Sequence, residues 1–380
     1  MLTTAPDTNR IGGNAVSTTR IDTSEQREMF AQRLVTDLMA SLETLGVWMG
    51  LRLGLYDAMD QAGPSTAAEL AATAGIDPRY AREWLEQQAV AGVLVTTDVE
   101  RDAEQRRYEL PQPQREVLLD EVSPHFTAPA AYALAGIAGV LPELLTAYRT
   151  GAGVPYAAYG QDIRDSIEQF NRPMFVNDLA AHWIPAVPEL AARLRADPPA
   201  RVADIACGGG WASIALARGY PKVLVDGFDL DEESIRQAKR NAAAAGVDDR
   251  VGFAVRDAAD PQLAGRYDAA MIFEALHDLA RPVEALAAAR ALLVSGGCLI
   301  VGDERVAETF TAPGDEMERL MYGFSILHCL PAGRNEIPSA ATGTVLRPAT
   351  LRAYATEAGF SQVHVLPIEN DMWRFYRLEA

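Results

Sequence analysis

The chain has 380 residues, of which 49% are hydrophobic, and it carries a formal net charge of −18. This length allows two domains with substantial buried cores. The negative charge disfavours binding to nucleic acid and to anionic membranes, so neither is an expected partner. The three cysteines, Cys207, Cys298 and Cys329, are scattered and lack C-x-x-C spacing. They indicate neither a disulfide framework nor a zinc site, and a reducing cytoplasmic location is expected.

The N-terminal third has the pattern of a winged-helix domain over residues 25–120. Residues 1–24 lack an apolar run and predict a disordered tail rather than a signal peptide. Apolar residues at helical spacing predict a long helix over 24–59, broken near Gly46 or Gly54. Thr66 and Asp77 are expected to cap two further helices, which extend to residues 74 and 92. Two short strands are expected at 93–95 and 107–110, in the position of a wing.

A winged helix serves either DNA binding or dimerisation, and charge favours the second interpretation. The helix that would enter the groove carries Arg79 and Arg82 against Asp77, Glu83 and Glu86. A DNA-binding face needs clustered basic charge, and this helix has none. We therefore expect a structural or dimerising module.

The rest of the chain predicts a helical segment over 121–195 and a doubly wound sheet over 196–380. A helix over 163–179 is expected to be interrupted at Pro173. The uncharged stretch 126–142 is short and reads as a buried helix, not a membrane span. Alternating strands and helices indicate a mostly parallel, Rossmann-like α/β fold. The expected strands are 201–206, 222–228, 251–255, 267–273, 297–302 and 362–366, and the expected helices are 211–218, 231–245, 281–293 and 348–358.

A glycine turn follows the first of these strands, within the sequence Val-Ala-Asp-Ile-Ala-Cys-Gly-Gly-Gly-Trp at 202–211. The dinucleotide fingerprint G-x-G-x-x-G would need a third small residue at position 211, where Trp211 stands. An NAD-dependent oxidoreductase is therefore disfavoured. The pattern D-x-G-x-G-x-G fits better, at Asp204, Ala206, Gly208 and Gly210, with alanine in place of its first glycine.

Acidic residues end the next three strands, where ligands of doubly wound sheets bind. Asp229 lies about twenty residues after the glycines, at the place of a ribose-binding acid. We prefer Asp229 to Asp226, which falls within the strand, and to Asp231, which fits the start of a helix; a helix cap is the alternative role for Asp229. Asp257 and Glu274 end the third and fourth strands.

Residues 30–380 resemble the winged-helix class I methyltransferases that use S-adenosylmethionine (SAM), in particular small-molecule O-methyltransferases. An actinobacterial branch is closest, since it shares Glu-Ala-Leu-His-Asp at 274–278, Leu-His-Cys-Leu-Pro at 327–331 and Pro-Ser-Ala-Ala-Thr-Gly-Thr at 338–344. The resemblance implies SAM as cofactor, S-adenosylhomocysteine as product, and a homodimer. It implies that cofactor-binding residues are Asp204, Ala206, Gly208, Gly210, Asp229, Leu230, Asp257, Ala258 and Glu274.

The resemblance also implies a catalytic base. In the O-methyltransferases a His-Asp pair follows strand four, and His277 and Asp278 match it. A histidine of near-neutral pKa can remove the acceptor's hydroxyl proton as the methyl group is transferred. This chain has Leu279 where those enzymes usually have tryptophan, and an ordinary helix-start role is the alternative for His277. His328, in an apolar segment, is the second catalytic candidate, with core packing as its alternative.

The acceptor pocket is expected between the middle helices and the segment near residue 320. Aromatic and methionine side chains there suit a flat, apolar acceptor, although core packing explains them equally well. The candidates are Tyr156, Tyr159, Phe170, Arg172, Phe175, Met321 and Phe324. No metal is expected, since no His/Asp/Glu group shows ligand spacing.

The sequence thus predicts a cytoplasmic SAM-dependent methyltransferase of secondary metabolism that methylates a small, hydrophobic or aromatic acceptor, most simply on oxygen. One alternative is an enzyme of the same fold that binds SAM and catalyses a rearrangement, decarboxylation or hydroxylation without methyl transfer. A second alternative is a SAM-sensing regulator that binds DNA through the winged helix.

Overall fold

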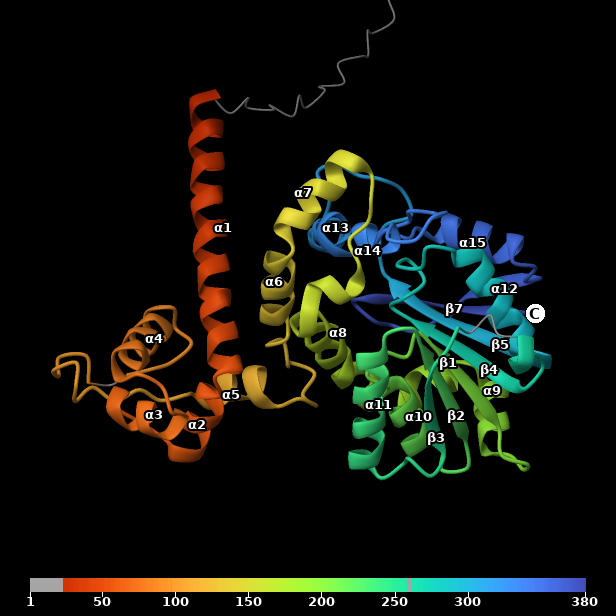
Figure 1. Cartoon of the computed structure of the whole chain (residues 1–380), viewed down its shortest axis with the longest axis horizontal. Helices are drawn as coiled ribbons and strands as arrows, with labels where there is room; N and C mark the ends of the chain where they lie inside the picture. Colours follow the sequence, from red (N-terminus) through yellow and green to blue (C-terminus); the bar gives the residue numbers. More distant parts are fainter. Residues whose placement is uncertain (1–22, 97, 258–260) are drawn as a thin grey trace, which may run out of the picture. The chain divides into compact units, whose positions relative to one another are not determined.

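The computed structural model describes residues 23–96, 98–257 and 261–380 (Figure 1). Residues 1–22 of the predicted N-terminal tail, and Ala258, therefore lie outside the described residues. The chain divides into a unit of residues 1–43 and a larger unit of residues 44–380. The first helix, α1 (Thr23–Arg52), begins in the smaller unit and ends in the larger one.

The part of α1 within the smaller unit displays a row of apolar side chains. Their exposed fractions lie between 53% and 60%. By length and composition α1 could cross a membrane, and so could the bent pair of α6 (Ala130–Gly139) and α7 (Leu141–Thr150) taken as one span. The exposed residues of α1 are Met29, Phe30, Leu34, Val35, Leu38, Met39 and Leu42.

In the winged-helix region the helices begin and end close to the predicted breaks and caps. The break after α1 falls at Gly54, which has a left-handed backbone, and not at Gly46. Thr66 forms a capping box with Glu69, and Asp77 caps the helix that starts at Pro78. The wing is reduced to isolated antiparallel bridges instead of the two predicted strands. The helices are α2 (Leu55–Ala62), α3 (Ala67–Ala74), α4 (Pro78–Val90) and α5 (Gln112–Leu119).

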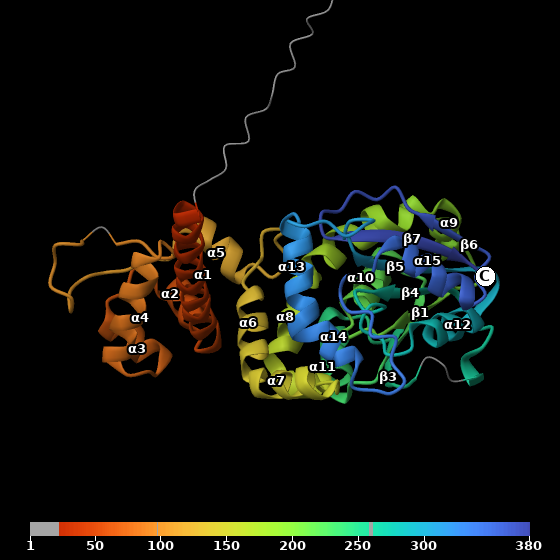
Figure 2. The same cartoon turned by 90° about the horizontal axis from the view of Figure 1, so that it is seen from above.

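The predicted helical segment lies between this region and the sheet in the sequence. Helix α8 (Gly160–Met174) ends just after Pro173, and the chain continues as the wider π-helix η2 (Phe175–Trp183). The proline therefore changes the type of helix without ending it. In both views α13 and α14 lie beside α6 and α7 (Figure 2). The elements are α6, α7, η1 (Tyr156–Tyr159), α8 (Gly160–Met174), η2 (Phe175–Trp183), η3 (Ile184–Ala186) and α9 (Pro188–Arg195).

A seven-stranded sheet in the order β3-β2-β1-β4-β5-β7-β6 forms the C-terminal part. The first five strands are parallel, and β7 is antiparallel to both of its neighbours. The strands are β1 (Arg201–Ile205), β2 (Leu224–Asp229), β3 (Val251–Val255), β4 (Tyr267–Phe273), β5 (Leu293–Glu304), β6 (Gln362–Val365) and β7 (Trp373–Glu379). The helices are α10 (Trp211–Gly219), α11 (Glu232–Ala245), η4 (Pro261–Leu263), α12 (Pro282–Leu292), α13 (Glu316–Phe324), η5 (Ser325–Cys329), α14 (Leu330–Gly333) and α15 (Pro348–Glu357).

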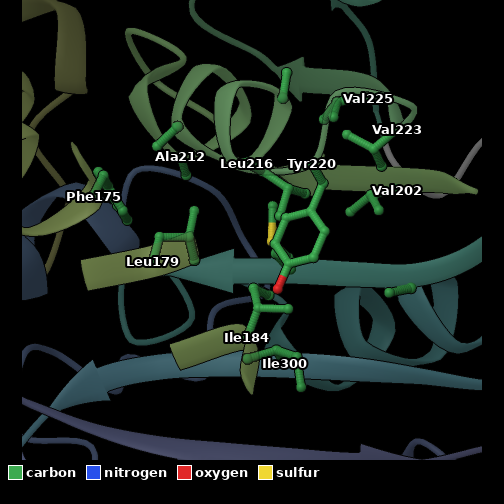
Figure 3. Packing of buried hydrophobic residues seen from close by; sticks show 14 of the residues in the cluster. Phe175, Leu179, Ile184, Val202, Ala212, Leu216, Tyr220, Val223, Val225 and Ile300 are labelled. Carbon is green, nitrogen blue, oxygen red and sulfur yellow. The ribbon is translucent and has the colours of Figure 1, made fainter. Parts of the chain in front are cut away.

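Helices cover both faces of the sheet, which defines a doubly wound α/β fold. One core joins the sheet to η2, α9, α10 and α11, and Tyr220 lies inside it close to Leu216 and Ile184 (Figure 3). The opposite core joins the sheet to α12 and α15. The sequence prediction omits β7, the short helix η4 and the helices between β5 and α15. It places the other strands and helices of the sheet domain within a few residues of their positions.

The strand register brings the carboxyl ends of the parallel strands to one edge. Ile205 pairs with Phe228 on one side and with Ile272 on the other, and Phe273 pairs with Gly302. The residues that follow these positions therefore gather at one edge of the sheet, where doubly wound folds bind their ligands.

Candidate active site

A cavity of about 460 Å³ opens at the carboxyl edge of the parallel strands. Its lining comes from the glycine turn, the start of α11, the ends of β3 and β4, and α8, which we call the cap helix because it lies over the glycine turn. All the described residues predicted to bind the cofactor line this cavity. They are Asp204, Ala206, Gly208, Gly210, Asp229, Leu230, Asp257 and Glu274.

The glycine turn has a left-handed backbone at three positions. Gly208, Gly210 and the non-glycine residue Ala206 all have positive φ angles, and that of Ala206 is 56°. A left-handed alanine costs on the order of 1 kcal/mol, which explains why glycine fits the first position of the D-x-G-x-G-x-G pattern. Asp229 holds the turn from the next strand, because its Oδ2 accepts a hydrogen bond of 2.9 Å from the backbone N–H of Gly208.

The structure separates the three aspartates considered for the ribose. Asp229 is largely enclosed at the cavity, where burial raises its pKa. Asp231 is the N-cap of α11, and its carboxylate also pairs with Arg164 at 2.8 Å. Asp226 lies within β2 and pairs with Arg201, outside this cavity. The assignments of Asp231 to the helix start and Asp226 to the strand interior are confirmed.

Asp204 faces inward beneath the glycine turn. Its side chain is 2% exposed and accepts a hydrogen bond of 2.6 Å from the hydroxyl of Ser213 on α10. Burial raises the pKa of Asp204 to about 7. The geometry therefore has Asp204 tying β1 to α10 as well as lining the cavity.

Glu274 lies at the end of β4 in another strained position, with φ of 50°. Its carboxyl group accepts a hydrogen bond from the side-chain amide of Asn171 on α8 and lies against the carboxyl group of Glu304 on β5. Burial raises the pKa of Glu274 to about 7, and burial together with Glu274 holds the pKa of Glu304 well above its usual range. The two carboxyl groups form a buried pair that resists full ionisation.

His277 lies between two aspartates. Its Nδ1–H donates to Asp303 Oδ1 at 2.9 Å, and its Nε2 lies 3.3 Å from Asp278 Oδ1. Burial opposes a charge on the imidazole, but the carboxylates of Asp303 and Asp278 outweigh burial and hold the pKa of His277 well above its ordinary value. Asp278 lines the cavity, whereas His277 is 2% exposed and lies behind it.

His328 has a different environment from His277. It is 2% exposed, and its ring packs edge-on against Tyr159 at 4.7 Å and Tyr156 at 5.9 Å between centroids. Burial lowers the pKa of His328, so this imidazole is neutral. Its Nδ1 lies 3.5 Å from Cys329 Sγ, and its Nε2 has no hydrogen-bond partner among the described residues.

Among the described residues, His277, Asp278 and Cys329 bring three potential metal ligands within 4.8 Å of one another. No sequence spacing indicates this group, because Cys329 comes from η5 and the other two follow β4. Burial raises the pKa of the Cys329 thiol to about 12, so the thiol is protonated in the absence of a cation.

The structure places the predicted acceptor residues in two environments. Tyr156 and Phe175 line the cavity. Tyr159 donates a hydrogen bond to the carbonyl of Leu327 and belongs to a small hydrophobic core outside the cavity. Phe324 packs against this core. The candidates outside the cavity lining are Tyr159, Phe170, Arg172, Met321 and Phe324.

Three further residues shape the site, and the sequence points to two of them, Asp303 at a strand end and Asn171 in the helical segment of the acceptor pocket, but not to Glu168. Asp303 orients His277, Asn171 binds Glu274, and Glu168 lies over the glycine turn. Asp303 ends β5, so its position at a strand end was the available signal. Asn171 belongs to the middle helices where the acceptor pocket is expected, whereas Glu168 on the same helix, α8, has no spacing rule that points to it.

Two families and several known proteins are similar to parts of this chain. Residues 196–337 match the family described as a methyltransferase domain, and residues 40–119 match the Rv2258c-like winged HTH domain. The chain is 34% identical to 27-O-demethylrifamycin SV methyltransferase of Amycolatopsis mediterranei over 104 residues, which are 27% of this chain and 38% of that protein. It is 26% identical to the ubiquinone biosynthesis O-methyltransferase of Bordetella avium over 218 residues, which are 57% of this chain and 83% of that protein.

A solved structure extends the likeness over nearly the whole fold. Human N-acetylserotonin methyltransferase in complex with SAM has a TM-score of 0.68 and 17% identity, and the match covers 94% of this chain and 99% of that one. At this identity the likeness concerns the fold.

Fold, glycine turn and strand-end acids together define a class I, Rossmann-like methyltransferase architecture. This chain carries a SAM-dependent methyltransferase domain, preceded by a winged-helix domain of the Rv2258c-like type. The predicted family resemblance, fold class and cofactor are confirmed.

Proposed function

We propose that the protein transfers the methyl group of SAM to a hydroxyl oxygen of a small, apolar or aromatic acceptor. The observation that carries the proposal is the Asp303–His277–Asp278 chain of side chains beside the cavity. The names of the curated relatives support oxygen as the acceptor atom, since the Bordetella avium protein is an O-methyltransferase. Phe175 and Tyr156 give the cavity an aromatic wall suited to a flat molecule.

The cavity fits SAM by its shape and its chemistry. Left-handed Ala206, Gly208 and Gly210 curve the turn around the space a ligand would fill, and Asp229 offers carboxylate oxygens to ribose hydroxyls. When bound, SAM supplies an electrophilic methyl group on a sulfonium sulfur. Acidic residues dominate the polar lining, which favours a cationic ligand.

In the proposed mechanism His277 accepts the proton of the acceptor hydroxyl. Asp303 fixes the ring by accepting the Nδ1 proton, so the lone pair for catalysis is that of Nε2. Asp278 lines the cavity with its Oδ1 3.3 Å from Nε2, so its carboxylate can orient the hydroxyl toward the imidazole. During methyl transfer to the hydroxyl oxygen, Nε2 of His277 would take up the hydroxyl proton. Positioning of the two reactants adds to the acceleration.

The raised pKa of His277 has a consequence for this mechanism. An imidazolium has no lone pair, so turnover requires loss of the proton that the two aspartates stabilise. A positive charge in the cavity disfavours that imidazolium and therefore lowers the pKa of His277. We expect turnover to rise with pH until His277 is neutral in the loaded enzyme.

We also propose that the protein is a cytoplasmic homodimer of secondary metabolism that binds no DNA and no membrane. A second copy would cover the exposed apolar row of α1, which satisfies a symmetric interface. The arginines of the winged helix support the absence of DNA binding, because Arg82 pairs with Glu104 and Arg106 with Glu86. The three described cysteines are free, as expected in a reducing compartment.

The test is a methyl-transfer assay with SAM labelled in the methyl group and a panel of phenolic acceptors, with native protein and His277→Ala. We expect labelled product from the native protein and a loss of turnover of about 100-fold or more in His277→Ala, with SAM affinity retained. Consumption of the acceptor with SAM left intact would instead identify the non-methylating alternative. Full turnover by His277→Ala would contradict the proposed base.

A further inference from the structure

The cap helix α8 places a carboxylate directly over the glycine turn. Glu168 approaches Gly209 so closely that a side chain at position 209 would overlap its carboxyl group. Glycine at 209 therefore has a steric reason: it leaves the space that Glu168 fills. Residues of α8 and of the glycine turn line the same cavity.

One oxygen of Glu168 is committed to holding this arrangement. Oε1 accepts a hydrogen bond of 3.0 Å from Trp211 Nε1 and another of 2.7 Å from the side-chain amide of Asn241 on α11. Asn241 also donates to the carbonyl oxygen of Gly209 at 2.8 Å. The guanidinium of Arg172 lies over the Trp211 ring, 4.0 Å from its centre.

The second oxygen of Glu168 accepts no hydrogen bond from the described residues, and the side chain lines the cavity. Burial raises the pKa of Glu168, and the hydrogen bonds from Asn241 and Trp211 only partly oppose this. A positively charged ligand stabilises the ionised form of such a carboxyl group, because it takes the place of the water that burial has removed.

This carboxylate stands where a dinucleotide enzyme would bind a phosphate. In that class the pyrophosphate lies over the glycine turn at the N-terminus of the following helix, which here is α10. A fixed carboxylate at this place repels a pyrophosphate and attracts a cation. Trp211, the residue that departs from the dinucleotide fingerprint, is also the residue that positions Glu168.

We propose that Glu168 binds the ammonium group of the amino-acid part of SAM and thereby selects a cationic adenosyl ligand over anionic dinucleotides at the glycine turn. This inference rests on the proposed function, because it assumes that the cavity takes SAM. It adds a recognition residue from the cap helix to the residues contributed by the sheet, and it couples the placement of α8 to occupation of the cofactor site.

The test is calorimetric titration with SAM, S-adenosylhomocysteine and 5′-methylthioadenosine, the last of which lacks the amino-acid part. The variant is Glu168→Gln, which keeps the shape and can still accept from Trp211 and Asn241. We expect it to bind SAM and S-adenosylhomocysteine about 10- to 100-fold more weakly, the range for a hydrogen bond to a charged group. Its affinity for 5′-methylthioadenosine should stay within about twofold of the native value.

Asp229→Ala serves as the matched control, since it should weaken all three ligands. An equal loss for all three ligands in Glu168→Gln would overturn the proposal, because it would show that Glu168 only supports the turn. Unchanged affinity for all three would also overturn it. Failure of the native protein to bind SAM or 5′-methylthioadenosine would count against the proposed function itself, so the two failures are distinguishable.

Discussion

Replacing Glu274 by glutamine is predicted to stabilise the ligand-free protein above neutral pH. Glu274 is enclosed at the end of β4, bonded to Asn171 and lying against Glu304. Glutamine has the same shape and needs no proton to remain neutral. The variant therefore avoids the cost of placing charge in this buried pair.

The magnitude follows from the pKa of Glu274, which burial raises from 4.5 to about 7. The folded protein holds its proton more tightly than the unfolded chain does. Stability from this group is therefore fully present below about pH 4.5 and is lost as the pH rises through about 7. At about 1.4 kcal/mol per pKa unit, the loss between these limits is roughly 3 kcal/mol.

The assay is urea unfolding, followed by tryptophan fluorescence, at about pH 5 and about pH 8. Relative to the native protein, Glu274→Gln should gain on the order of 3 kcal/mol in the free energy of unfolding between the two pH values. Glu308→Gln, a change at an exposed glutamate, is the control and should show no such gain. Parallel pH profiles for native protein and Glu274→Gln would refute the reasoning.

Four further outcomes are expected. Ala206→Gly should change the free energy of unfolding by no more than about 1 kcal/mol. Ala206→Val should lower it by more than about 2 kcal/mol and weaken SAM binding, because a branched side chain is disfavoured at a positive φ. Equal stability and equal SAM affinity of the two variants, in denaturation and titration, would contradict this. Asp303→Asn should move the rise of kcat with pH to lower pH, since the carboxylate raises the pKa of His277, and should lower the maximal rate about 10-fold or more; an unmoved profile would argue against the pair. Leu38→Asp should shift the mass measured by light scattering from dimer to monomer, and an unchanged dimer would place the interface elsewhere. A chelator should leave methyl transfer unchanged, whereas its loss, restored by a divalent metal, would assign a metal to the group around Cys329.

The sequence predicts most of the sheet because buried strands leave short apolar runs between helical periods. Strand β7 was not predicted, because Trp373–Glu379 interleaves arginines with aromatic residues and so has no continuous apolar run. It pairs antiparallel with β5, the last of the parallel strands. The segment from α13 to α14 also escaped, because its π-helix has no simple period.

The site residues also fall into those that the sequence predicts and those that only the structure reveals. Asp204, Asp229 and Glu274 were predictable because parallel strands end at one edge, so a position in the sequence implies a position in space. The contacts of Glu168 with Gly209 and of Cys329 with His277 depend on how segments far apart in the sequence pack together. No spacing within the chain determines such contacts, and the structure was needed to find them.

The most direct test of the central claim is calorimetric titration of the native protein with SAM, S-adenosylhomocysteine and NAD. Both adenosyl ligands should bind with dissociation constants in the micromolar range, a binding free energy on the order of −8 kcal/mol, and NAD should not bind. Binding of NAD with no binding of either adenosyl ligand would contradict the assignment of the glycine-turn cavity to SAM.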